Sequence, residues 1–207
     1  MTPGAISAQS RIDLLAIADL VQEGARVLDV GCGEGELLEI LRDQRRVDGR
    51  GVELSQAGVN ACVARGLSVV QGDADRDLVD YPDDSFDYVI LSQTIQAMHN
   101  PRAVLEQMKR IGRHVIVSFP NFGHWKIRLQ LLFTGRMPVT RTLAHEWYNT
   151  PNIHLCTVQD FLDLCAKENL AIEKALMLSK DQSWTNGNPG LRANLLAEQA
   201  VFLLYRK

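Results

Sequence analysis

A run of alternating glycines, GCGEG at positions 31–35, most constrains what this chain can fold into. The run follows an apolar stretch, 27–30, that is typical of a buried strand, and it precedes 36–41, whose apolar spacing is typical of a helix. A glycine-rich turn between a strand and a helix lets the backbone approach a ligand closely and points free N–H groups at it. The sequence therefore predicts an α/β fold with a ligand site where this strand ends.

Strand and helix patterns alternate along the chain, which predicts a parallel sheet with helices on both faces. After a turn-rich loop at 181–189 that contains Trp184, the last strand is expected to form an antiparallel hairpin with the one before it. The segment 120–156 is rich in aromatics, glycine and proline, and we interpret it as a lid insertion for a substrate or partner in a single domain, 1–207. The expected strands are 27–30, 51–54, 67–71, 86–91, 114–119, 171–178 and 199–205, and the expected helices are 11–21, 36–45, 56–64, 101–111 and 157–167.

Composition excludes several classes of protein. A hydrophobic fraction of 46% in 207 residues is sufficient for a real core, and a net charge of −3 argues against a nucleic-acid partner. We find neither a signal peptide nor a stretch approaching the roughly 20 apolar residues of a membrane span. The four cysteines form no C-x-x-C pair, so reduced thiols in a cytoplasmic protein without a membrane partner are expected.

The spacing of the glycines distinguishes two classes of nucleotide-binding fold. Dinucleotide-binding folds use G-x-G-x-x-G, whereas the glycines here alternate and Asp29 stands two residues before the first of them. This pattern resembles motif I of the class I S-adenosylmethionine (SAM) methyltransferase superfamily. The resemblance implies a Rossmann-like α/β fold with a seven-stranded, mostly parallel sheet and an antiparallel carboxyl-terminal hairpin strand. A nicotinamide-binding domain is the weaker alternative.

The chain offers candidate residues for each part of a SAM-type ligand. Gly31, Cys32 and Gly33 form the turn against the methionyl and ribose portion, with Cys32 acting as a small residue and not as a nucleophile. Asp29 can orient this turn and attract the ammonium or sulfonium group of the ligand. Glu53 stands at the end of the second strand, where open α/β folds place an acid for the ribose hydroxyls. We therefore predict that these five residues bind SAM or S-adenosyl-L-homocysteine.

Two later strand ends complete the predicted site. Leu54 follows Glu53 and is expected to pack on the adenine face. The resemblance assigns adenine recognition to Asp73 and Ala74, with the carboxylate accepting a hydrogen bond from the adenine amino group. After the fourth strand, Leu91 and Gln93 are expected to line the same crevice, because ligands bind at the carboxyl ends of parallel strands.

The chain beyond the fifth strand carries a more specific resemblance. The runs 118–125 (SFPNFGHW), 135–140 (GRMPVT), 146–156 (EWYNTPNIHLC) and 194–200 (NLLAEQA) look like the MetW family of bacterial methionine-biosynthesis proteins. The resemblance extends from about residue 11 onward and implies a role in methionine synthesis linked to homoserine O-acyltransferase. It does not supply a methyl acceptor. Two hypotheses follow: a SAM-binding partner that supports the acyltransferase, or an independent SAM-dependent methyltransferase acting on a small anionic metabolite.

Charge is distributed unevenly in the same part of the chain. No Asp or Glu lies between Glu106 and Glu146, although this span contains seven Lys or Arg residues, Arg141 among them. A basic, aromatic segment suits an anionic acceptor or an acidic protein face, and the alternative is a solvated basic surface. The sequence assigns no catalytic residue, although His145 or Tyr148 could act as a general base. The histidine and cysteine spacings match no known metal site, so we expect no bound metal.

Overall fold

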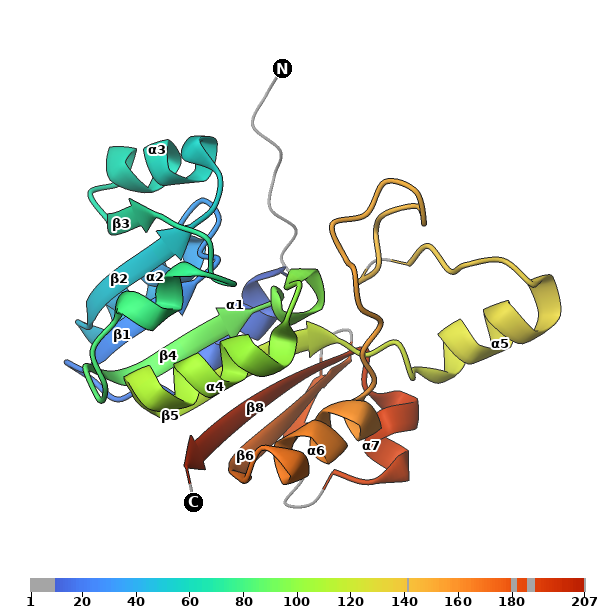
Figure 1. Ribbon diagram of the computed structural model, residues 1–207. Coiled ribbons are helices and arrows are strands. Elements are labelled where there is room, and N and C mark those ends of the chain that lie inside the picture. Colours follow the sequence, from blue (N-terminus) through green and yellow to red (C-terminus); the bar gives the residue numbers. More distant parts are fainter. Residues whose placement is uncertain (1–9, 141, 180–181, 186–188, 207) are drawn as a thin grey trace.

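An eight-stranded sheet, in the order β3-β2-β1-β4-β5-β8-β6-β7, forms the centre of the computed structural model, which describes residues 10–140, 142–179, 182–185 and 189–206 (Figure 1). The first five strands are parallel to one another, and β8 is antiparallel to both β5 and β6. The strands are β1 (Arg26–Val30), β2 (Asp48–Glu53), β3 (Ser68–Gln71), β4 (Phe86–Ser92), β5 (Gly112–Pro120), β6 (Leu170–Ser179), β7 (Gln182–Thr185) and β8 (Gln199–Arg206).

The predicted fold class is confirmed, and all seven expected strands are present. One strand was not predicted: β7 lies inside the segment expected to be a turn-rich loop, and it pairs antiparallel with β6. The rest of that loop, residues 181 and 186–188, and the side chain of Trp184 lie outside the described part of the chain. The antiparallel pair forms as expected, with β8 inserted between β5 and β6.

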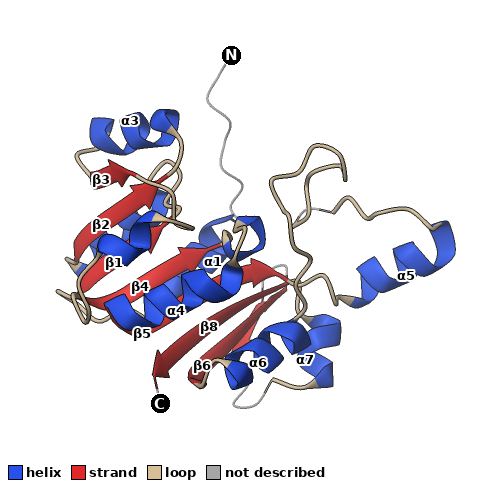
Figure 2. Cartoon of the chain, in the orientation of Figure 1, coloured by secondary structure: helices blue, strands red, loops and turns tan. Residues whose placement is uncertain are grey.

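Helices cover both faces of the sheet (Figure 2), as the alternating pattern predicts. In β4, Val89 and Leu91 lie in the core beneath α4 and α6, whereas Tyr88 and Ile90 lie in the core beneath α1 and α2. This two-residue alternation follows from the pleat of a strand buried on both faces. The helices are α1 (Ser10–Ala18), α2 (Glu36–Arg45), α3 (Gln56–Ala64), α4 (Pro101–Ile111), α5 (Trp125–Thr134), α6 (Val158–Lys167) and α7 (Leu191–Leu196), with short 3₁₀ turns η1 (Asp77–Asp80) and η2 (Ile95–Ala97).

Local capping explains why several helices begin where the sequence predicts. The Asn100 side chain accepts a hydrogen bond from the Ala103 N–H, and Pro101 occupies the first helical turn of α4, where its missing N–H costs nothing. At α6, Thr157 and Asp160 form the reciprocal capping box. Two helices, α5 and α7, were not predicted.

The chain between β5 and α6 departs from the layered body. We call residues 122–156 the arm; it contains α5, which stands away from the sheet (Figure 1). Ile127 is the one residue of α5 that is buried. Within the described ranges, no helix has the length and apolar character that a bilayer crossing requires.

Candidate functional site

The glycine turn between β1 and α2 has a conformation that requires glycine. Gly31, Gly33 and Gly35 have φ angles of 71°, 56° and 82°, in the left-handed region. A Cβ on Gly31 would lie 2.7 Å from Cγ2 of Thr94, and one on Gly35 would collide with the Leu67 side chain. A Cβ on Gly33, in contrast, would meet nothing within 4 Å. The turn is therefore packed tightly at both ends and open at its centre.

Glu53 is joined directly to this turn. Its Oε2 accepts a hydrogen bond from the Gly33 N–H at 2.9 Å, and its Oε1 accepts one from the Ser55 N–H at 2.8 Å. The N–H of Gly31 donates to the Val52 carbonyl at 2.8 Å, which ties the turn to the end of β2 a second time. Each carboxylate oxygen retains an acceptor site, so Glu53 can bind hydroxyl groups next to the turn.

Asp29 lies beneath the turn and is almost completely buried, with 2% of its surface exposed. Within the described residues, its Oδ1 has no hydrogen-bond partner. Burial, and secondarily the charge of Glu53, raises the pKa of the Asp29 carboxyl to about 7. A buried carboxylate with an oxygen that has no hydrogen-bond partner is costly, and a positive charge beside it would reduce that cost. The arrangement therefore favours a cationic group at the turn.

Cys32 does not have the properties of a nucleophile. Its side chain is 9% exposed, and burial raises the pKa of its thiol far above the usual value. All four cysteines of the chain are free thiols in the structure. A reactive cysteine needs a stabilised thiolate, which this environment opposes.

The loop after β3 lies against the end of β2. The Gly72 N–H donates to the Glu53 carbonyl at 3.0 Å, and this brings Asp73 and Ala74 to the same edge of the sheet. The Asp73 carboxylate accepts the N–H of Asp75 at 3.0 Å, and its side chain is 36% exposed. Ala74 packs against the main core, whereas Leu54 is 66% exposed beside Glu53. Leu54 therefore has a free face for a planar ligand.

Of the two residues predicted after β4, only Gln93 has an accessible side chain. Leu91 is fully buried in the core, so only its backbone can contact a ligand at the strand end. Gln93 has a φ of 53°, and its N–H donates to the Ser118 carbonyl at 3.0 Å. This bond ties the ends of β4 and β5 together next to the glycine turn, where Thr94 contacts Gly31.

Sequence reasoning missed one structural carboxylate, Asp75. It accepts the backbone N–H groups of His99 and Asn100, both at 2.9 Å, and thereby joins the loop after β3 to the start of α4. Burial alone would raise the pKa of Asp75, but these hydrogen bonds outweigh it and lower the pKa. No sequence motif predicts this contact, because the hydrogen-bonded residues are 24 and 25 positions apart in the chain.

The arm returns to the body next to η2. The carbonyl of Gln96 accepts the N–H groups of Ile153 and His154 at 2.8 and 2.9 Å. His145 lines a small cavity of about 40 Å³ inside the arm, and Tyr148 is 68% exposed. Three or more histidine, cysteine or acidic side chains do not gather as a metal site anywhere in the described ranges.

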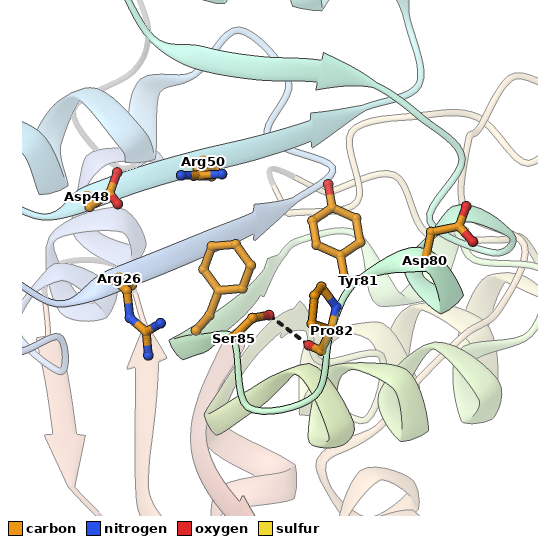
Figure 3. A pocket seen from close by; sticks show the side chains of 8 residues that line it. Arg26, Asp48, Arg50, Asp80, Tyr81, Pro82 and Ser85 are labelled. Carbon is orange, nitrogen blue, oxygen red and sulfur yellow. Dashed lines mark hydrogen bonds between the residues drawn. The ribbon is translucent and has the colours of Figure 1, made fainter.

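A larger cavity, of about 520 Å³, opens at the opposite ends of the strands (Figure 3). Arg26 and Asp48, the first residues of β1 and β2, line it together with Arg50 and Tyr81. Arg26 is held by Asp87 at 3.3 Å. None of the ten predicted cofactor residues lines this cavity. Because ligands of open α/β folds bind at the carboxyl ends of the strands, we do not place the cofactor here.

Residues 11–204 match the model of the family described as "Methionine biosynthesis protein MetW". The chain belongs to the MetW family. It is 36% identical over 205 residues to the bifunctional methionine biosynthesis protein MetXA/MetW of Rhodopirellula baltica. That alignment covers 95% of this chain but 33% of the relative, so the chain spans about a third of that protein's length.

Solved structures identify the fold as that of class I SAM-dependent methyltransferases. A SAM-dependent methyltransferase from Archaeoglobus fulgidus superposes with a TM-score of 0.70 at 15% identity, covering 96% of this chain and 93% of the other. The cyclase SpnF superposes with a TM-score of 0.67 at 17% identity, covering 99% and 84%. Proteins of this fold thus include one named for a reaction other than methyl transfer, and the fold alone does not fix an activity.

Proposed function

We propose that this MetW-family protein binds SAM, or S-adenosyl-L-homocysteine, at the glycine turn and supports homoserine O-acyltransferase in methionine biosynthesis. The observation that carries the cofactor assignment is the convergence of Asp29, Glu53 and the open face of Gly33 at neighbouring strand ends. The observation that carries the partner assignment is the relative whose printed name joins MetXA and MetW in one bifunctional protein. We take MetXA to be the acyltransferase part of that relative.

Each predicted residue has a distinct part in the proposed site. The turn Gly31, Cys32 and Gly33 presents backbone to the methionyl and ribose portion, and Glu53 accepts from the ribose hydroxyls. Asp29 lies beneath the turn as the counter-charge for a cationic group. SAM bound there would supply a methyl group activated by a positively charged sulfur.

The outer part of the ligand would meet the residues at the ends of β2, β3 and β4. Leu54 offers its exposed side chain to the adenine, and the Asp73 carboxylate is the acceptor for the adenine amino group. Ala74 forms the wall of the loop that carries Asp73. Gln93 contributes its side chain at the end of β4, and Leu91 contributes backbone only.

The exposure of the arm favours the partner role over independent catalysis on a small anionic metabolite. Methyl transfer requires an aligned acceptor in a site that excludes water. The arm surrounds a cavity of only about 40 Å³, while Trp147 and Tyr148 are 74% and 68% exposed. Large exposed aromatic side chains are typical of a protein-binding surface.

The test is a reconstitution of the acyltransferase reaction with purified proteins. Homoserine O-acyltransferase from the same organism is assayed alone and with this protein, with and without SAM, and labelled SAM reports any methyl transfer. We expect acyltransferase activity to rise on mixing, with no methylated product. A methylated product made by this protein without the acyltransferase would establish the independent methyltransferase instead.

A variant connects the cofactor site to this assay. Glu53→Ala should weaken SAM binding at least tenfold by titration calorimetry, because hydrogen bonds to a charged carboxylate contribute about 1.5–3 kcal/mol. Asp48→Ala, which removes an acid from the opposite end of the same strand, is the matched control and should bind SAM normally. Equal SAM affinity in wild type and Glu53→Ala would remove Glu53 from the site.

A further inference from the structure

Helix α5 carries an apolar stripe that faces solvent. Trp125, Leu129, Leu132 and Phe133 occupy positions i, i+4, i+7 and i+8, which lie on one side of a helix. They are 39%, 41%, 74% and 77% exposed, respectively. We call these four residues the α5 face. A stripe of this kind normally packs against a core, so its exposure indicates a surface that another molecule covers.

The base of α5 is fixed to the body by a buried hydrogen-bond network. Asn121 is fully buried, and its Nδ2 donates to the carbonyls of Asn194 and Ala197, both at 2.8 Å. Its Oδ1 accepts the N–H groups of Gly123 and Val158 at 3.0 and 3.2 Å. Three of these bonds connect Asn121 to α7, to the residue after α7 and to α6, and the fourth, from Gly123, fixes the turn at the start of the arm, so the α5 face is presented from a firmly held base.

The hydrogen-bond network at the base of α5 leaves no space for a side chain at Gly123. A Cβ at this position would lie 2.5 Å from Oδ1 of Asn194 and 3.0 Å from Oδ1 of Asn121. The Gly123 carbonyl also accepts the Nε–H of Arg128 at 2.6 Å, which fixes the first turns of α5. A surface held in its bound conformation loses less freedom on association, which favours binding.

Two basic residues lie on or next to the α5 face. Lys126 lies over the Trp125 ring at 5.6 Å, and Arg136 follows the helix end. Neither Lys126 nor Arg136 forms an ion pair with any residue that the structure describes. Within 107–145, the segment that contains α5, the charged side chains are all basic, and these two lie beside the apolar side chains of the face.

We propose that the α5 face is the docking surface for the homoserine O-acyltransferase, through an apolar patch on that enzyme bordered by acidic residues. This inference rests on the proposed function, since it names where the partner binds. Two observations select this occupant: the basic border requires acidic groups opposite, and a relative of this chain is named as a fusion with MetXA. Pairing of two copies through this face is disfavoured, because it would bring Lys126 and Arg136 of both copies together.

The test measures association of the purified chain with purified homoserine O-acyltransferase by sedimentation velocity and calorimetry. The variant Leu132→Ser with Phe133→Ser should weaken binding at least tenfold, because it removes the most exposed apolar side chains of the face. Its matched control is Val63→Ser with Val79→Ser, which removes two side chains that are 58% and 62% exposed on the body. The control should bind as wild type does.

Charge is tested separately with residues that have no role in holding the arm. Lys126→Glu with Arg136→Glu should weaken association at least threefold, and the effect should diminish at high salt. Lys167→Glu with Lys174→Glu, at exposed positions of α6 and β6, changes the net charge by the same amount and is the control. Circular dichroism and SAM titration of each variant verify that the fold and the cofactor site are intact.

The outcomes separate this inference from the proposed function. If wild type binds the acyltransferase and the serine double variant binds equally well, the α5 face is wrong while the partner role stands. If wild type does not bind at all, both are overturned. Self-association of the chain, or flotation with anionic phospholipid vesicles, that the serine double variant abolishes would assign the face to a second copy or to a membrane and overturn the proposal.

Discussion

The glycine turn and the arm differ in how far the chain itself covers them: the turn is hydrogen-bonded and packed, and the arm leaves apolar side chains in solvent. At the turn, backbone N–H groups bond to Val52 and Glu53, and a Cβ on Gly31 or Gly35 would clash with its surroundings. On the arm, α5 leaves an apolar stripe in solvent. The turn is therefore packed and hydrogen-bonded within the chain, whereas the arm presents an apolar surface of the kind that another protein covers.

The largest expected effect breaks the packing at the turn. Gly35→Ala should lower the free energy of unfolding by about 4 kcal/mol, since it combines a left-handed φ with overpacking against Leu67 and Cys62. Gly24→Ala is the control, because Gly24 has a φ of 71° and open space around it. That control should lose only about 1–2 kcal/mol in urea denaturation. Equal losses in the two variants would show that the turn is not tightly packed.

The second prediction concerns the pH dependence of stability that arises from Asp29, the buried carboxyl beneath the turn. The folded pKa of Asp29, about 7, lies above the ordinary value of 3.8, so the folded state holds this proton more tightly. The resulting stability is fully present below about pH 4 and is lost as the pH rises to about 7 and beyond. Over that window wild type should lose about 4 kcal/mol relative to Asp29→Asn, measured without ligand.

The quantity to measure is the difference in free energy of unfolding between wild type and Asp29→Asn at each pH. Burial also raises the pKa of Asp13, to about 6, and this residue contributes a pH dependence to both proteins alike. A constant stability difference between wild type and Asp29→Asn from pH 4 to pH 8 would mean that Asp29 is paired or hydrated in solution.

The smallest expected effect belongs to the arm. Leu132→Ser with Phe133→Ser should change the free energy of unfolding of the isolated chain by no more than about 0.5 kcal/mol, because these side chains are mostly exposed. Chemical denaturation measures this directly. A loss above about 1 kcal/mol would show that the two side chains pack on the chain itself in solution, and the contrast with the turn would disappear.

Local pattern was sufficient to predict most of the sheet and the capped helices. All seven expected strands form, and α2, α3 and α4 begin and end at the predicted residues, because their caps and apolar spacing agree. Helix α5 was missed because Ile127 and Leu131 lie on the side away from the α5 face, so apolar residues occupy two sides and the sequence shows no clear amphipathic period. Helix α7 and strand β7 are short, with 6 and 4 residues, and give little periodic signal.

The candidate site was grouped by the same reasoning and stays a prediction, and the structure adds where each of its side chains lies. Residues at the ends of parallel strands meet at one edge, so Asp29, Glu53 and Asp73 could be grouped without a structure. Leu91 was expected to line the crevice, and because the pleat of β4 places its side chain in the core, only its backbone is available at the strand end. The Asp75 contact with the start of α4 joins distant segments and was not predictable from either one.

The sequence by itself determined the α/β class, the glycine turn and the family, because these depend on residue types at fixed short spacings. Only the tertiary structure decided that Glu53 binds the turn N–H, that Asp29 is buried with its Oδ1 unpaired among the described residues, and that the α5 face is exposed. The physical reason is that burial and exposure depend on which distant segments pack together. The sequence pattern of an apolar stripe is the same whether the stripe is buried in a core or exposed to solvent.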